Sequence, residues 1–225
     1  MDINNTSTKI FLLVIVLLTG LVVTGAVVWS SGHPVRVSVV DIKNVKIDGS
    51  DAFAGQENAP ITIAFWSDYQ CPVCKQFELN TLPQLLKEYA DTGKVKIVFM
   101  DLAFLGNDSK DAALYGRSIW KLYPNQYLTW RTLMYTAQDE EGDKGFGNAT
   151  TIDALNATIP GLDANKITAD VQANMNGYQA AIDADRLEVQ KAGITGTPSF
   201  IIGTQLVQGA RPYVEFKTAI DAVLK

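Results

Sequence analysis

The chain has 225 residues, a formal net charge of −5 at pH 7, two cysteines and one histidine. These counts exclude a multi-histidine metal site, a four-thiolate zinc or iron–sulfur site within one chain, and a framework of several disulfides. The acidic balance argues against nucleic acid as the main partner, because phosphate binding needs a clustered lysine and arginine surface. We therefore predict no metal, no cofactor and no nucleic-acid partner.

An uncharged apolar stretch follows a short N-terminal tail at residues 1–9. Residues 10–29 read IFLLVIVLLTGLVVTGAVVW, and this stretch at about 1.5 Å rise per residue spans roughly 30 Å, the thickness of a bilayer core. A cleaved signal peptide usually has a shorter apolar stretch and a site of small residues, for which residues 24–26 are a poor candidate. We predict a transmembrane signal-anchor at 10–29, with a cleaved signal as the alternative.

Residues 30–54 are predicted to form a linker with a leading strand. Valines alternate with other residues from Val35 onward, which favours a strand within 35–47. The chain's single histidine, His33, has no acidic or thiol neighbour and is interpreted as an exposed linker residue. Residues 48–60 are rich in glycine, aspartate, asparagine and proline, and are predicted to form a loop.

The next segment joins a short apolar run to the two cysteines. Residues 61–66 read ITIAFW, which is typical of a buried strand, and Cys71-Pro72-Val73-Cys74 follows after a turn. Pro72 suits the first position of a helix, where its missing N–H is no loss and its φ is preset. Apolar residues continue at helical spacing, and Pro83 predicts a kink or break among them. A second buried strand is predicted at 95–100.

The position of the two cysteines predicts redox chemistry. A helix N-terminus presents unsatisfied N–H groups and a positive dipole end, both of which favour a thiolate. Because the thiolate is the nucleophile in disulfide exchange, we predict that Cys71 is the exposed attacking sulfur. Cys74, one turn further along and more buried, is predicted to resolve the mixed disulfide. The alternatives are a structural disulfide, half of a zinc site completed by another chain, and two inert thiols.

Two further motifs accompany this pair. Residues 55–60 read GQENAP before the segment FWSDYQCPVC, and residues 196–200 read GTPSF. Together these segments resemble the DsbA-like thiol–disulfide oxidoreductases, from about Gly55 to the C-terminus. The resemblance implies a thioredoxin fold with an inserted helical domain, and disulfide exchange with unfolded or partly folded proteins outside the cytoplasm.

The resemblance also assigns roles around the cysteines. Thr197 and Pro198 correspond to the family's cis-proline loop, which implies a cis bond that faces the cysteines and exposes the backbone of Thr197 to an extended client segment. It also places the Thr197 hydroxyl near the sulfurs, where it tunes their pKa. Pro72 and Val73 are predicted to tune the active site. Some members carry a histidine between the cysteines, so the apolar Val73 predicts a less depressed Cys71 pKa and a weaker oxidant.

A second departure concerns a buried carboxylate that many relatives carry six residues before the first cysteine. Phe65 stands at that position and has no proton to move. Asp68 is a conceivable substitute, although we interpret it as a turn residue.

The remainder of the chain agrees with an α/β fold of this kind. No convincing strand lies between Asp101 and Gly196, and Asp108 or Ser109 is predicted to cap the first helix there. Apolar stripes at 167–175 and 178–192 are read as two separate helices. A hairpin about Gly203-Thr204 and a closing helix at 212–224 complete the pattern. The predicted parts of the thioredoxin fold are 55–106 and 194–225, with the all-helical insertion at 107–193.

These observations predict a membrane-anchored thiol–disulfide oxidoreductase. It would introduce or exchange disulfides in client proteins through Cys71 and Cys74, with a single-pass anchor at 10–29 in the cell membrane and the catalytic domain outside the cytoplasm. A separate redox partner would recycle the pair. The alternatives are a disulfide reductase or isomerase with the same residues, and a thioredoxin-fold chaperone that binds Cu(I) through the two thiolates.

Overall fold

The computed structural model describes residues 40–225. The predicted tail, the predicted signal-anchor and the first part of the predicted linker lie outside the described residues. Within residues 40–225, no helix combines the length and the apolar character that a bilayer crossing requires.

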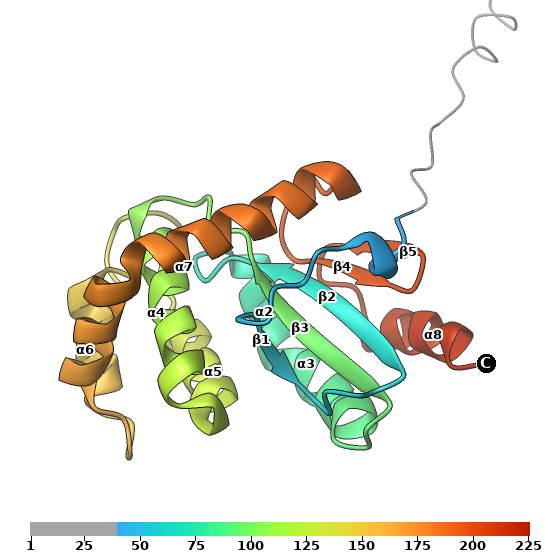
Figure 1. Ribbon diagram of the computed structural model, residues 1–225, viewed down its shortest axis with the longest axis horizontal. Coiled ribbons are helices and arrows are strands. Elements are labelled where there is room, and N and C mark those ends of the chain that lie inside the picture. Colours follow the sequence, from blue (N-terminus) through green and yellow to red (C-terminus); the bar gives the residue numbers. More distant parts are fainter. Residues whose placement is uncertain (1–39) are drawn as a thin grey trace, which may run out of the picture. The chain divides into compact units, whose positions relative to one another are not determined.

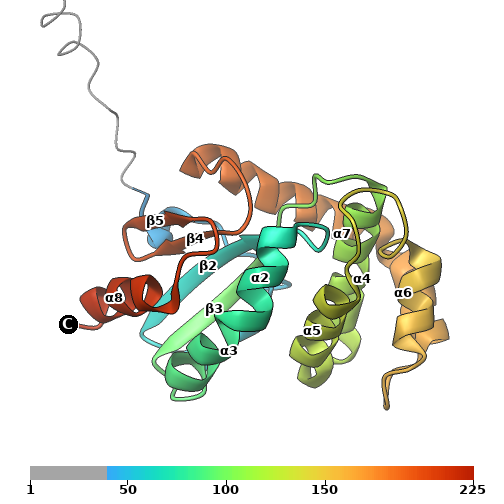
Figure 2. The same ribbon diagram turned by 180° about the vertical axis from the view of Figure 1, so that it is seen from behind.

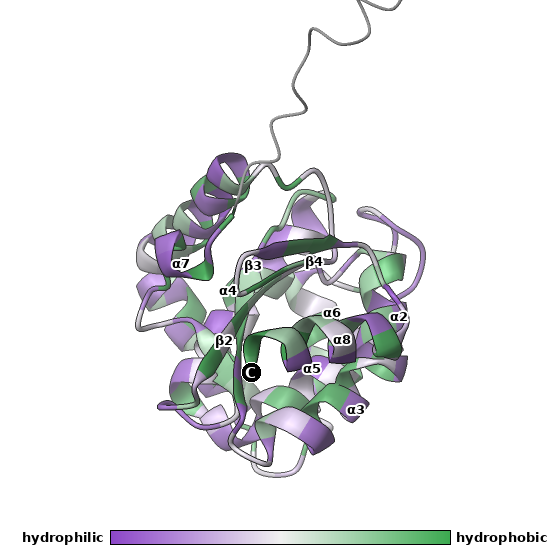
Figure 3. Ribbon diagram, turned by 90° about the vertical axis from the view of Figure 1, so that its right-hand side faces the viewer, coloured by the Kyte–Doolittle hydropathy of each residue, from purple (hydrophilic) through white to green (hydrophobic). Residues whose placement is uncertain are grey.

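A five-stranded mixed sheet forms the centre of the fold (Figure 1). Its order is β1-β3-β2-β4-β5, and only the β2–β3 pair is parallel. The strands are β1 (Ala52–Ala54), β2 (Ile61–Ser67), β3 (Val95–Asp101), β4 (Ser199–Ile202) and β5 (Gln205–Gln208). Figure 3 shows that the central strands are mostly hydrophobic, as expected for strands that are buried on both faces.

Successive residues of the central strands fill two hydrophobic cores, because side chains alternate between the faces of a sheet. On one face, Phe65 and Phe200 stack with ring centroids 4.5 Å apart. Helices α2 (Pro72–Asn80), α3 (Leu82–Leu85) and α8 (Tyr213–Val223) cover this face (Figure 2). On the other face, Trp66 packs with Val189 and Ala192 from the end of a long helix. The Trp66 indole N–H also donates to the carbonyl of Asp185 at 3.1 Å, which ties that helix to the sheet.

Four α-helices and one short 3-10 helix, Pro124–Gln126, separate β3 from β4, and no strand lies between these two strands. The α-helices are α4 (Asn107–Leu122), α5 (Tyr127–Ala137), α6 (Ala149–Asn156) and α7 (Ala164–Ala192). In Figure 1, α4, α5 and α6 lie together beside the sheet, and α7 runs from them back toward β4. The thioredoxin fold with a helical insertion is therefore confirmed. Pro83 also breaks the helix as predicted, because α2 ends at Asn80 and a separate short helix contains the proline.

The predicted leading strand within 35–47 falls partly on residues 35–39, which lie outside the described residues, and the part at 40–47 forms no strand. Of the range 35–47, the described part holds a 3-10 turn at Ile42–Asn44, where the Asp41 carboxylate accepts the N–H of Lys43 at 2.9 Å. The prediction of a loop throughout 48–60 was wrong, because the strand β1 lies inside that segment. Its three residues carry little local signal, and they form a strand because they pair antiparallel with β3.

Two predictions within the helical insertion were also wrong. The stripes at 167–175 and 178–192 belong to the single helix α7, which continues through Gly177 until Gly193 ends it in the left-handed conformation. Helix α4 begins after Gly106, so Asp108 lies inside it and is not its cap. The Asp143 carboxylate, from a distant loop, accepts the N–H of Asp108 at 2.9 Å and satisfies a donor of the first turn.

Candidate active site

Cys71 lies at the junction between the end of β2 and the start of α2. It is the N-cap residue of α2, and Pro72 occupies the first turn, as the sequence predicted. The N–H of Cys71 donates to the carbonyl of Asp68 at 3.1 Å, and its own carbonyl accepts the N–H of Lys75 at 3.1 Å. The cysteine is therefore held by a hydrogen-bonded turn on one side and by the helix on the other.

The Asp68 carboxylate organises that turn. It is fully buried, and it accepts the N–H groups of Gln70 at 2.8 Å, Phe104 at 2.9 Å and Leu105 at 3.2 Å. Burial raises the pKa of Asp68, while these donors and Ser109 oppose that effect. The three backbone hydrogen bonds agree with the interpretation of Asp68 as a turn residue, and they join the cysteine turn to the loop after β3.

A cis peptide bond between Thr197 and Pro198 faces the cysteines, in the position that the resemblance implied. The carbonyl oxygen of Thr197 lies 3.5 Å from the Cys71 sulfur. The two cysteines are reduced and form no disulfide. Cys71 is 7% exposed and Cys74 is 0% exposed. Cys71 is thus less exposed than predicted, because the Thr197 loop lies against its sulfur, but it is still the more accessible of the two.

The two thiols have opposite electrostatic environments. A hydrogen bond from the Cys74 side chain, aided by the Thr197 side chain and the N–H groups of Cys74 and Val73, outweighs desolvation and lowers the pKa of Cys71 to about 6. Burial raises the pKa of Cys74 well above its usual value, and the neighbouring Cys71 adds to this effect. Near neutral pH, Cys71 is therefore mainly a thiolate and Cys74 a protonated thiol.

The Thr197 hydroxyl is part of this environment. Its oxygen is buried and has no hydrogen-bond partner within residues 40–225. The Thr197 side chain lowers the pKa of both cysteines, which agrees with the predicted tuning role of its hydroxyl. Val73 lies 39% exposed between the two cysteines and brings no charge to the site.

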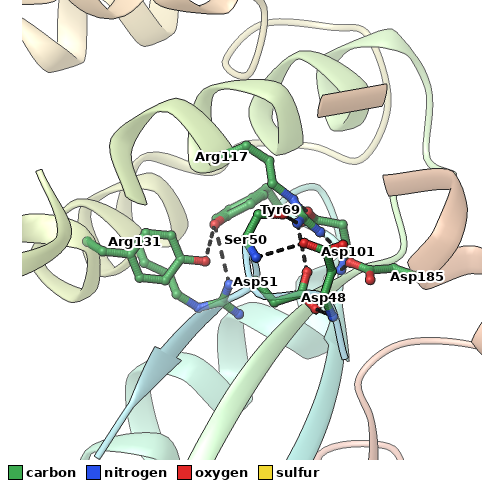
Figure 4. A network of polar contacts seen from close by, with 9 residues as sticks. Asp48, Ser50, Asp51, Tyr69, Asp101, Arg117, Arg131 and Asp185 are labelled. Atoms are coloured by element: carbon green, nitrogen blue, oxygen red, sulfur yellow. Dashed lines mark hydrogen bonds and ion pairs between the residues drawn. The ribbon is translucent and has the colours of Figure 1, made fainter. Parts of the chain in front are cut away.

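Arg131 and Glu78 form a buried ion pair that the sequence did not predict. Arg131 of α5 donates through Nε to both carboxylate oxygens of Glu78 at 3.0 Å. Its other nitrogens donate to the hydroxyl groups of Ser67 and Tyr69, and Figure 4 shows the contact with Tyr69. Glu78 lies one turn after Cys74 on α2. The guanidinium also lies 5.2 Å from the centre of the ring of Phe65, the residue that stands where many relatives carry a carboxylate. Glu78 and Arg131 each follow a buried aromatic residue in the sequence. Exposed charged residues of amphipathic helices also follow buried apolar ones, so the sequence pattern does not show that these two side chains are buried.

A second buried network connects the insertion to the sheet. Arg117 of α4 donates to the carboxylates of Asp51 and Asp101 at 2.7 Å each, and also to Asp185 of α7 (Figure 4). Asp51 precedes β1 and Asp101 ends β3, and the pairing of these strands brings both residues to the same end of the sheet. The Arg117 guanidinium thus joins this end of the sheet to the helices α4 and α7 of the insertion. Within residues 40–225, no group of three or more histidine, cysteine, aspartate or glutamate side chains is arranged to hold a metal ion.

Comparison with known proteins agrees with this geometry. A family model described as Thioredoxin matches residues 48–222. The chain belongs to the thioredoxin family. Among curated relatives of this thioredoxin-family chain, the Probable disulfide bond formation protein D of Bacillus anthracis is 27% identical over 213 residues and covers 91% of each chain. The Disulfide bond formation protein D of Bacillus subtilis is 25% identical over 171 residues, or 76% of each chain.

Solved structures show the same fold. The oxidised BdbD of Bacillus subtilis matches with a TM-score of 0.69 at 23% identity, over 78% of this chain and 93% of that one. The thiol-disulfide exchange protein alpha-DsbA2 of Wolbachia pipientis matches with a TM-score of 0.68 at 27% identity, over 78% and 88% of the two chains. The thioredoxin-family chain is therefore a DsbA-like enzyme, a disulfide oxidoreductase.

Proposed function

We propose that this enzyme is a membrane-anchored, extracytoplasmic oxidoreductase that introduces or exchanges disulfides in client proteins through Cys71 and Cys74. The observation that carries the proposal is the opposite pKa shift of the two thiols. The easily ionised sulfur of Cys71 serves as nucleophile and leaving group, and the protonated thiol of the more buried Cys74 resolves the mixed disulfide. A structural disulfide or an inert thiol pair needs no such difference.

In the oxidising direction, the reaction begins with a disulfide between Cys71 and Cys74. A client thiolate attacks the Cys71 sulfur, the bond to Cys74 breaks, and Cys74 leaves with the electron pair and takes up a proton. A second client thiolate then attacks the client sulfur of the mixed disulfide, and Cys71 leaves as a thiolate. The client has lost two electrons to the cysteine pair, which a redox partner must reoxidise.

The low pKa of Cys71 favours this direction. A stabilised thiolate makes the reduced enzyme more stable relative to its disulfide form, so the pair accepts electrons more readily. A pKa of about 6 lies between the values of about 7 for thioredoxin and about 3.5 for a strongly oxidising relative. The enzyme is accordingly a moderate oxidant, which supports the expectation drawn from Val73. With a reducing partner, the same steps run backwards as a reductase or isomerase.

Thr197 and Pro198 serve as the client-docking residues in this proposal. The Thr197 carbonyl is 3.5 Å from the Cys71 sulfur, so a client strand that pairs with this backbone brings its own sulfur to the reaction. Pro72 and Val73 shape the site by placing Cys71 at the start of α2 and by keeping a cation away from it. Backbone pairing is tolerant of client sequence, as an enzyme with many clients requires.

The proposed membrane anchor is based on residues 10–29, and the proposed extracytoplasmic location of the catalytic domain is based on where disulfides are stable. Disulfides persist outside the reducing cytoplasm, so a catalyst of their formation works there. The uncharged apolar stretch is long enough to cross a bilayer. Alkaline extraction of membranes tests the anchor: the full chain should stay in the membrane fraction, and release of the intact chain would contradict the proposal.

Trapping of clients tests the exchange chemistry. Cys74→Ala removes the resolving thiol, so mixed disulfides between Cys71 and clients should accumulate in cells, and Cys71→Ala with Cys74→Ala should remove them. Adducts together with a mostly oxidised wild type support an oxidase, whereas adducts with a mostly reduced wild type support a reductase or isomerase. Absence of adducts, together with tight Cu(I) binding to both thiols, would overturn the proposal in favour of the metal chaperone.

A further inference from the structure

An apolar groove lies beside the cis-proline loop. It has a volume of about 250 Å³ and is formed by the loop after β3, the C-terminal half of α7 and the residues that precede Thr197. Its apolar lining residues are Leu102, Phe104, Val189 and Ile194, and Arg186, Gln190, Thr195 and Gly196 complete the lining. We call it the α7 groove. Its volume is below the range of about 300–1,000 Å³ typical of small-molecule sites, so a single large side chain suits it better.

The α7 groove lies next to the loop that contacts the reacting sulfur. Gly196 forms part of its wall, and the next residue, Thr197, has its carbonyl 3.5 Å from the Cys71 sulfur. Another lining residue, Phe104, donates its N–H to the Asp68 carboxylate, and the Asp68 carbonyl accepts the N–H of Cys71. An extended client advances about 3.3 Å per residue, so a residue only a few positions from its cysteine reaches the groove.

The charge of the groove points to the chemistry of its occupant. Arg186 is exposed and forms no ion pair within residues 40–225, and no carboxylate lines the groove. By contrast, Arg117 and Arg131 are buried and paired with carboxylates. A cation beside an apolar floor, in a chain with net charge −5, offers its charge to an acidic group of a bound partner.

Phe104 supplies the apolar part of this surface. Its side chain is 46% exposed, although its backbone is fixed by the Asp68 carboxylate. An exposed aromatic ring on an anchored backbone offers contact area with little conformational entropy to lose on binding. The groove therefore presents one rigid apolar anchor and one cation within a few residues of the active site.

We propose that the α7 groove binds the client segment that flanks the reacting cysteine, and that it selects an apolar side chain next to an acidic one. This inference rests on the proposed function, because it assigns sequence preference to the same exchange reaction. Backbone pairing at Thr197 allows many client sequences to bind, and the α7 groove makes some of them react faster than others.

Short synthetic peptides test this ranking. Each carries one cysteine, activated as a mixed disulfide with thionitrobenzoate, and a Leu-Glu, Gly-Glu or Leu-Lys pair placed before or after it. In the full chain with Cys74→Ala, the Cys71 thiolate attacks the peptide sulfur, forms a disulfide with it and releases the coloured thionitrobenzoate anion. We expect Leu-Glu to react about tenfold faster than Gly-Glu, and about threefold faster than Leu-Lys.

Variants separate the two parts of the groove. Arg186→Glu should reverse the preference between Leu-Glu and Leu-Lys, whereas the exposed Lys87→Glu, which makes the same charge change outside the groove, should not. Phe104→Ala should reduce the preference for leucine over glycine and leave the charge preference in place. These are ratios of rates within one variant, so a general loss of reactivity does not imitate them.

The possible failures are distinguishable. Equal rates for all peptides, or the same change of ratio in Arg186→Glu and Lys87→Glu, would overturn the groove while exchange itself continued. If no peptide formed a disulfide with Cys71, the proposed function would fall and the groove with it. A reversed ratio confined to Arg186→Glu supports the inference.

Discussion

The hydrogen bond from Cys74 makes the largest contribution to the low pKa of Cys71, and replacing Cys74 tests it directly. A hydrogen bond to a charged group contributes about 1.5 kcal/mol at the lower end of its range, which corresponds to about one pKa unit. Cys74→Ala should therefore raise the pKa of Cys71 from about 6 to about 7. At pH 7, the thiolate fraction would fall from about nine-tenths to about one half.

The matched control is Cys74→Ser, which keeps a hydroxyl donor at the same position and should hold the pKa of Cys71 nearer to the wild-type value. The assay is the pH dependence of Cys71 alkylation by iodoacetamide, followed by mass spectrometry of the intact reduced chain. Thr197→Val should move the midpoint upward as well, because it removes a second contribution. The reasoning is refuted if Cys74→Ala titrates at or below the wild type, or if alanine and serine variants titrate alike.

Two buried networks give further predictions. Arg131→Met leaves Glu78 buried without its partner and should lower the free energy of unfolding in urea by about 3–5 kcal/mol; a loss below about 1 kcal/mol, typical of exposed pairs, would contradict this. Burial, with the nearby carboxylates of Asp101 and Asp51, raises the pKa of Asp185 to about 8 despite Arg117. The folded state then keeps a proton that the unfolded state releases near about pH 4, so this group makes stability fall as pH rises from about 4 to about 8. Asp185→Asn should flatten the decline in melting temperature between these limits; the exposed Asp183→Asn should not, and an equal slope in both variants would count against the assignment.

The active site was predictable because its signals are local. A strand-like run, a turn and a proline after the first cysteine lie within fourteen consecutive residues, 61–74. Pro72 at the first turn needs no distant contact to suit a helix start. The cis-proline loop was located by family resemblance, since nothing in residues 196–200 alone distinguishes a cis bond from a trans bond.

Elements that depend on distant partners were not predictable in the same way. The short strand β1 exists through its pairing with β3, more than forty residues later in the chain. The first-turn donor of α4 is satisfied by Asp143 and not by a neighbouring side chain. Helix α7 passes through Gly177 because its ends, at Asp163 and Gly193, are well defined and its buried residues continue on both sides. Propensity at one residue is a weak determinant when tertiary packing supports the whole helix.

By itself, the sequence determined that the two thiols lie together at the start of a helix, with Pro72 and Val73 and no histidine between them. Only the tertiary structure decided how acidic each thiol is, because Thr197, which lies 126 residues after Cys71, contributes to the pKa of both thiols, and because the burial of Cys74 depends on packing. It also decided that Arg131 and Glu78 are a buried pair, since charge pattern along one helix does not reveal the element that covers it. Electrostatic effects depend on distance and desolvation, and both are properties of the folded chain.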